Sequence, residues 1–183
     1  MTATECEPAA LAVGLDEVKA YLRIDHNEED ALLAGLIRSA TGLCEMFTGQ
    51  TLIARPFVEP MAAEALWRRL TRTPVQAIED VSGEGADGEA LTLPTETYAI
   101  DIDHRGDGWV KLTGVAGGRT IARLKVRYRA GMGNDWNGIA APLRQGIVRL
   151  VAHMHLNRDD GGEATPPATV AALWRPWRRM HLR

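Results

Sequence analysis

The sequence contains few of the residues on which catalytic and cross-linked proteins commonly depend. Serine occurs only twice in 183 residues, at Ser39 and Ser82, and cysteine only at Cys6 and Cys44. Two cysteines cannot by themselves form a disulfide framework or a four-ligand zinc site. No apolar run approaches about 18 residues, and the N-terminus lacks the basic and apolar parts of a signal peptide. We therefore expect neither a membrane-spanning nor a secreted protein.

The overall composition suits one soluble domain with a sizeable core, because 45% of the residues are hydrophobic and 25% are charged. The charge is distributed unevenly: residues 1–90 contain 7 Lys+Arg and 16 Asp+Glu, whereas residues 91–183 contain 14 and 8. Such asymmetry suits a protein that meets unlike partners at its two ends, or that packs head-to-tail against copies of itself. Mutual neutralisation of the two halves within one fold is the alternative.

Helical periodicity occurs on both sides of a β-rich middle. Residues 15–22 form the first predicted helix, and residues 28–48 form a longer one, with Asn27 as N-cap and Gly49 as the residue that ends it. A third helix is predicted after Pro142, to about residue 157. These elements lead us to expect a mainly α fold, in which a helical bundle carries a β-rich insertion between its second and third main helices and an extended C-terminal tail.

Short β-rich runs separated by glycine-rich turns fill the middle of the chain. In the run 121–128 and just after it, basic and apolar residues alternate, which predicts one basic and one apolar strand face. We divide the chain into a helical-bundle domain at 1–158, with its insertion at about 53–130, a linker at 159–167 and a docking tail at 168–183. The basic residues of this strand are Arg123, Lys125, Arg127 and Arg129.

No motif predicts a catalytic, metal or cofactor site. The acids of 101–107 lack the calcium-loop pattern and are interpreted as a hairpin turn, although a metal-dependent hydrolase is a remote alternative. His153 and His155 are two residues apart on a predicted helix, so they cannot chelate one ion together. Cys44 lies on an apolar helix face, which favours an inert, buried thiol.

Several segments together resemble a known family. Residues 15–52 read LDEVKAYLRIDHNEEDALLAGLIRSATGLCEMFTGQTL, in which a short helix, an R-I-D turn and an acidic cap lead into a long helix that ends near TGQ. The segments TPVQAIEDV (73–81), VRYRAGMGNDWNGIAAPLRQGIVRLVAHMHLNRD (126–159) and VAALWRPWRRMHLR (170–183) follow in the family's order. The combination resembles the head–tail connector (adaptor) proteins of long-tailed bacteriophages and the equivalent adaptors of alphaproteobacterial gene transfer agents.

The resemblance implies a structural protein of the particle neck, not an enzyme. The protein would form a homo-oligomeric ring, expected to be a dodecamer, with a portal protein above it and a stopper or tail-completion protein below. Double-stranded DNA would pass transiently through the ring during packaging and ejection. The resemblance also implies assembly in the bacterial cytoplasm, without a membrane partner or a cofactor.

The C-terminal segment 168–183 is the predicted portal-binding site, because it combines residue types that are enriched at binding hot spots. The linker gives it reach, and Pro176 limits its helix, so we expect 169–173 to be helical and the last ten residues to be extended. The alternative is that the tail folds back and its tryptophans close the core of the protein. The predicted contacts are Leu173, Trp174, Arg175, Pro176, Trp177, Arg178 and Arg179.

The acidic start of the long helix is the predicted channel-facing surface, because DNA that slides should meet few cations. Simple helix capping by solvated carboxylates is the alternative. The alternative function is a DNA-binding module that uses the basic strand or the tail, but a net charge of −3 argues against generic duplex binding. The channel-facing candidates are Asp25, Glu28, Glu29 and Asp30.

Overall fold

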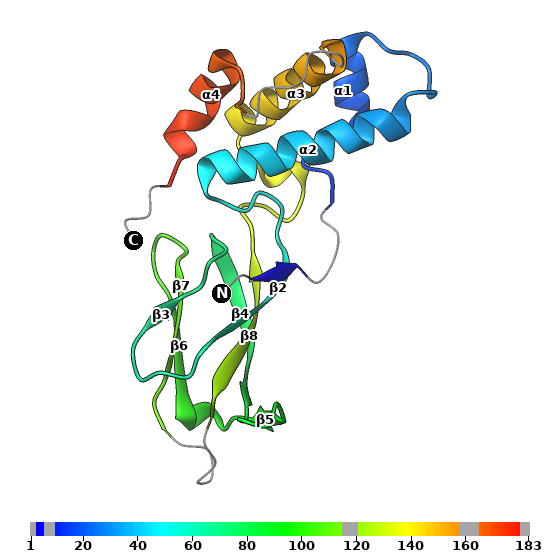
Figure 1. Ribbon diagram of the computed structural model, residues 1–183. Coiled ribbons are helices and arrows are strands. Elements are labelled where there is room, and N and C mark those ends of the chain that lie inside the picture. Colours follow the sequence, from blue (N-terminus) through cyan, green and yellow to red (C-terminus); the bar gives the residue numbers. More distant parts are fainter. Residues whose placement is uncertain (1–2, 6–9, 115–120, 158–164, 180–183) are drawn as a thin grey trace. The chain divides into compact units, whose positions relative to one another are not determined.

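The structure is a computed structural model that describes residues 3–5, 10–114, 121–157 and 165–179. The chain divides into two compact units (Figure 1). Met1–Pro8 and Ala54–Gly131 form the β unit, and Ala9–Ile53 and Met132–Arg183 form the helical unit. Residue 158, residues 159–164 of the predicted linker and residues 180–183 of the predicted tail lie outside the described residues.

Two antiparallel sheets build the β unit. The larger sheet has the order β1-β2-β8-β4-β5, and the smaller has the order β3-β7-β6. The strands are β1 (Thr4–Glu5), β2 (Arg55–Ala62), β3 (Arg68–Arg69), β4 (Val75–Glu84), β5 (Ala90–Thr92), β6 (Tyr98–Ile102), β7 (Gly108–Leu112) and β8 (Arg123–Ala130).

The expectation of a mainly α fold is wrong. In the described part of the chain, 28% of the residues lie in strands, so the fold is mixed α/β. The physical reason is that the alternating strands direct enough apolar side chains to one side to close a hydrophobic core of their own. Phe57, Leu124 and Tyr128 of the large sheet share this core with Val110 of the small sheet.

The predicted alternation of the basic strand is confirmed. Along β8, the basic side chains are exposed or half-buried, whereas Leu124, Val126, Tyr128 and Ala130 are buried. β8 lies between β2 and β4 in the large sheet, so its apolar face meets the core and its basic face points to the other side. The basic row therefore follows the middle of an exposed sheet face.

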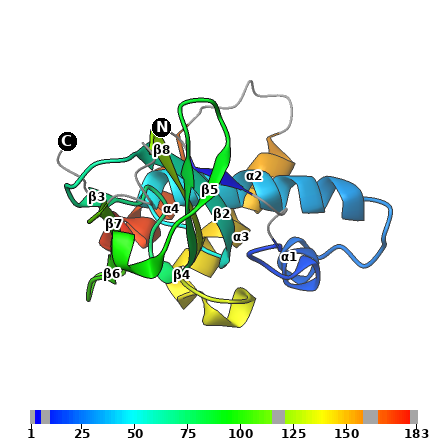
Figure 2. The same cartoon turned by 90° about the horizontal axis from the view of Figure 1, so that it is seen from below.

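The helical unit contains α1 (Leu15–Leu22), α2 (Asp30–Thr48), α3 (Ala141–Leu156) and α4 (Ala168–Trp174). The apolar stripes predicted from the sequence form its core, with Leu33, Ile37, Leu143 and Ile147 fully buried. α1 crosses α2 steeply and is seen nearly end-on in Figure 2. None of the helices in the described residues is both long and apolar enough to span a membrane.

The helix ends show where local signals are sufficient. α1 has the predicted bounds, and α2 ends at Gly49, whose φ of 68° lies in the left-handed region that glycine tolerates. The predicted start of α2 is wrong by two residues, because the helix begins at Asp30 rather than at residue 28. The side chain of Asn27 does not cap the helix but accepts a hydrogen bond from Lys19 Nζ.

Candidate interaction surfaces

The C-terminal segment is anchored to the helical unit by Trp174. Its side chain has no exposed surface, and its Nε1 donates a hydrogen bond to the Leu143 carbonyl oxygen at 3.3 Å. Its ring centroid lies 5.9 Å from that of Phe47 on α2. Gly146 on α3 makes room for the indole, since a Cβ at this position would lie 2.1 Å from Trp174 Nε1. The sequence thus pairs a glycine and a tryptophan to dock α4 on α3.

The residues after Trp174 also fold back on the helical unit. Arg175–Trp177 form a single 3₁₀ turn, the Gln50 side chain donates to the Trp177 carbonyl oxygen, and Arg179 N donates to Thr48 O at 2.8 Å. The predicted helix at 169–173 is confirmed, but the expected extended conformation is wrong for residues 175–177. Burying the large Trp174 side chain favours the folded-back arrangement over a free tail.

The predicted portal contacts therefore divide by exposure. Trp174 is buried in the core, as the alternative interpretation of the tail required. Arg175, Pro176 and Arg178 are exposed, and the Arg178 guanidinium lies 5.6 Å from the centroid of the Phe47 ring. Leu173, Trp177 and Arg179 are half-buried. Two exposed arginines therefore stand on either side of the half-buried Trp177 in the sequence.

The four acidic candidates divide in a similar way. Glu29 Oε2 lies 3.0 Å from His155 Nε2 of α3, and Asp30 Oδ1 accepts a hydrogen bond of 2.8 Å from Lys19 Nζ of α1. These two carboxylates therefore tie the start of α2 to its neighbours. Asp25 and Glu28 are exposed, whereas Glu29 and Asp30 are half-buried.

A buried carboxylate was missed in the sequence. Glu59 is 3% exposed and accepts hydrogen bonds from Thr71 N at 3.0 Å, Thr71 Oγ1 at 2.9 Å and Tyr128 Oη at 2.8 Å. Burial, followed by the neighbouring Glu59 carboxylate, raises the pKa of Tyr128 above its ordinary value. The sequence does contain a sign of this buried carboxylate: Glu59 lies at an inward-facing position of an alternating strand, between Phe57 and Met61. The network fixes a loop and offers no reacting group to solvent.

The remaining candidates have structural roles. Asp103 accepts hydrogen bonds from Arg105 N and Asp107 N in the predicted turn between β6 and β7, and these bonds lower its pKa. Cys44 is fully buried, and burial raises the pKa of its thiol. Among the described residues, no group of three His, Cys, Asp or Glu side chains could hold a metal ion. The exposed arginines of the C-terminal segment and the exposed acids before α2 remain as candidate surfaces.

These surfaces, on an α/β fold of two units, suit a protein that functions through contacts with other chains. Residues 13–85 match the sequence profile of the family described as Phage gp6-like head-tail connector protein. The resemblance seen in the sequence is therefore confirmed. That family and the neck chains described next are defined by their place in a particle rather than by a reaction. No curated protein matches the chain.

The fold is similar to that of chains in solved gene transfer agent (GTA) particles. It matches a chain in the neck of an empty GTA particle computed with C6 symmetry, with a TM-score of 0.80 and 24% identity. It also matches a chain in the virion of a native GTA particle (TM-score 0.79, 23% identity) and one in the neck of a native GTA particle computed with C12 symmetry (0.77, 24%). Each match covers 100% of this chain and 98% of the other.

Proposed function

We propose that the protein is a structural head–tail adaptor in the neck of a phage or a gene transfer agent. Copies of the chain form a closed ring between the portal protein and a stopper or tail-completion protein, and double-stranded DNA passes through it. The observation that carries this proposal is the fold similarity, over the whole chain, to chains in necks computed with C6 and C12 symmetry. The family match over residues 13–85 supports it independently.

The exposed part of the C-terminal segment is the proposed portal contact. Arg175 and Arg178 present guanidinium groups that can form bidentate hydrogen bonds with portal carboxylates. The half-buried Trp177 lies between them in the sequence and offers apolar surface. Trp174 contributes indirectly, because its burial fixes the segment from which these side chains project.

The exposed acids Asp25 and Glu28 are the proposed channel-facing residues. A wall with few cations forms few phosphate contacts, each of which would add affinity and slow the sliding of DNA. Replacing both by lysine should slow DNA delivery while leaving the melting temperature unchanged, because neither carboxylate has a structural partner among the described contacts. Unchanged delivery would assign them to the solvated surface.

A paired charge reversal tests the adaptor role. Particles are prepared from cells in which the chain is replaced by R175E/R178E, or by the control R38E/R149E, which reverses two exposed arginines on α2 and α3. We expect wild-type and control particles to contain the chain in the neck, and R175E/R178E particles to lack it. Electron microscopy and protein analysis of purified particles measure this. A wild-type chain absent from particles would refute the adaptor role, and normal incorporation of R175E/R178E would refute the portal contact alone.

The structure gives the DNA-binding alternative less support than the row of four basic residues in the sequence does. Asp80 and Glu84 on β4 lie directly opposite Arg127 and Arg123 on β8, so two of its four cations face carboxylates within the sheet. A salt-dependent gel shift with duplex DNA would measure any such binding.

A further inference from the structure

On the exposed face of the large sheet, two basic residues of β8 have acidic neighbours on β4, but the neighbours of the basic row on β2 are uncharged. On the β4 side of the basic row, Asp80 is paired in register with Arg127, and Glu84 with Arg123. On the β2 side, the residues in register are uncharged: Pro56, Val58, Pro60 and Ala62. Two of the four cations of β8, Arg123 and Arg127, therefore face carboxylates on β4, and all four border an uncharged strip on β2.

Lys125 lies at the centre of this open side. It is exposed, and its register neighbours are Pro60 on β2 and Ser82 on β4, neither of which carries charge. Val58 lies one row further along β2, between Thr4 of β1 and Arg127 of β8, and is half-buried. The surface thus combines apolar contact area with positive charge. Its partner should be an acidic segment with small side chains.

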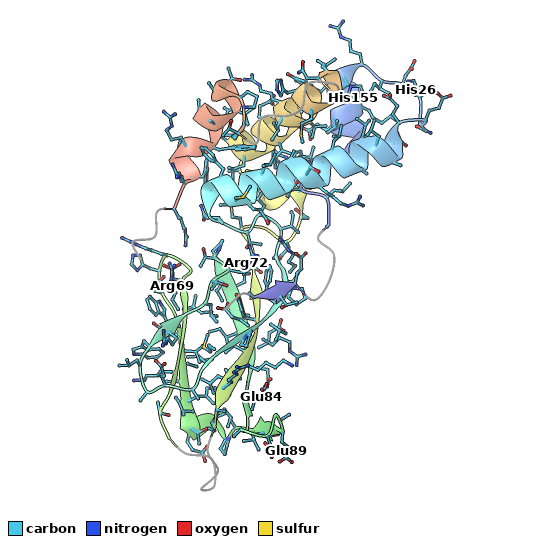
Figure 3. All side chains as sticks on the ribbon, viewed as in Figure 1. His26, Arg69, Arg72, Glu84, Glu89 and His155 are labelled. Carbon is cyan, nitrogen blue, oxygen red and sulfur yellow. The ribbon has the colours of Figure 1, made fainter. Side chains whose placement is uncertain are left out.

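The same chain contains a segment of that kind. No lysine or arginine occurs between Arg72 and Arg105, whereas this stretch contains eight acids. Part of it forms the β4–β5 hairpin, whose tight turn carries Asp87 and Glu89, both exposed. Figure 3 shows Glu84 and Glu89 at the same end of the β unit. The hairpin is small at its tip, because Gly85, Ala86 and Gly88 surround Asp87.

We propose that the exposed face of the large sheet, along β8 and β2, binds the acidic β4–β5 hairpin of a second copy of this chain. The contact joins two different surfaces of the β unit, so it is heterologous and can be repeated from copy to copy until a ring closes. The inference rests on the proposed ring and deepens it by naming one of its interfaces. Charge complementarity fixes the choice of occupant, since the hairpin supplies carboxylates where the face supplies cations.

Two variants test the contact separately. V58E/K125E places carboxylates on the face, and the new side chain at 58 lies opposite Arg127, where an opposite charge is tolerated by the sheet. A86K/E89K makes the hairpin tip basic. S39E/R149E is the control, because it produces the same change in net charge as V58E/K125E at exposed positions of α2 and α3. Melting curves establish that each variant is folded.

Sedimentation velocity at low and high salt measures self-association at protein concentrations up to about 100 µM. We expect wild type and control to associate at low salt, and each of the two interface variants alone to remain monomeric, because its hairpin and face carry the same sign. An equimolar mixture of the two variants should associate again, since each hairpin then meets a face of opposite charge. Such complexes alternate the two variants.

Several results would overturn the proposal. These are a wild-type chain that stays monomeric at low salt, variants that associate as wild type does, and a mixture that does not recover. Binding of duplex DNA to the face, abolished by V58E/K125E, would assign the surface to nucleic acid instead. Particles whose necks still contain the V58E/K125E chain would retain the adaptor role while refuting this interface, whereas absence of the wild-type chain from necks would refute the adaptor role itself.

Discussion

Replacement of Trp174 by alanine tests whether the C-terminal segment is part of the core. The side chain is fully buried and bonded to the Leu143 carbonyl oxygen, so its removal should leave a cavity between α3 and α4. Truncation of a buried tryptophan to alanine costs about 3–5 kcal/mol. Against a typical domain stability of about 5–15 kcal/mol, this loss should be easily measured. A segment that stayed free of the core would lose almost nothing.

Gly146 makes the same test sharper. In wild type, a Cβ at this position would lie 2.1 Å from Trp174 Nε1, so Gly146→Ala forces overpacking that costs about 1–3 kcal/mol. In the Trp174→Ala background the obstacle is absent, and alanine in mid-helix should stabilise by about 0.5–1 kcal/mol relative to glycine. The sign of the Gly146→Ala effect should therefore reverse between the two backgrounds.

Urea unfolding, followed by circular dichroism at 222 nm, measures all four proteins of this cycle. Most of the helical signal comes from the helical unit, so the transition reports the unit that contains both residues. The expected coupling is the difference between the two Gly146→Ala effects, about 1.5–4 kcal/mol, as for residues in direct contact. A Trp174→Ala loss below about 1 kcal/mol, or an equal Gly146→Ala effect in both backgrounds, would refute the packing described.

Three further predictions concern other buried groups. The raised pKa of Tyr128 means that folding favours its protonated form, so the free energy of unfolding should fall as the pH rises above the ordinary pKa of 10.0. Tyr128→Phe should remove the part of this fall that comes from Tyr128, although Glu59 then loses one hydrogen-bond donor. Lys19→Met should cost about 1–3 kcal/mol in urea unfolding, because Asp30 loses its partner. In a Cys6→Ser background, Cys44 should react with a thiol reagent only after unfolding, and rapid reaction of this native variant would contradict the burial of Cys44.

Local signals in the sequence were sufficient for most individual elements. The bounds of α1, the end of α2 at Gly49 and the two faces of β8 all follow from periodicity or from one residue's conformational preference. The start of α2 was missed because Lys19, a residue of another helix, bonds to Asn27 and Asp30 and so competes with simple capping. Such a contact depends on how α1 meets α2, which periodicity does not determine.

The fold class and the candidate surfaces required knowledge of long-range pairing. β-rich runs were visible in the middle of the chain, although β1 and β5 were not predicted. That the strands form two sheets around a separate core depends on their partners. The burial of Trp174 likewise depends on a glycine 28 positions earlier, at 146, whose role becomes clear only when α3 and α4 are side by side. Composition drew attention to the segment, but it could not distinguish the buried anchoring residue from the exposed ones.

That division matters for how the C-terminal segment could bind. A free tail with the same arginines would lose conformational entropy when it docked, because backbone and side chains would have to be ordered at that moment. Burial of Trp174 and the bond from Arg179 N to Thr48 O order the described part of the segment beforehand. In the proposed adaptor, Arg175 and Arg178 would therefore meet the portal from a fixed backbone, and Trp174 would strengthen binding without touching the partner. Trp174→Ala should then weaken portal attachment through the loss of order alone.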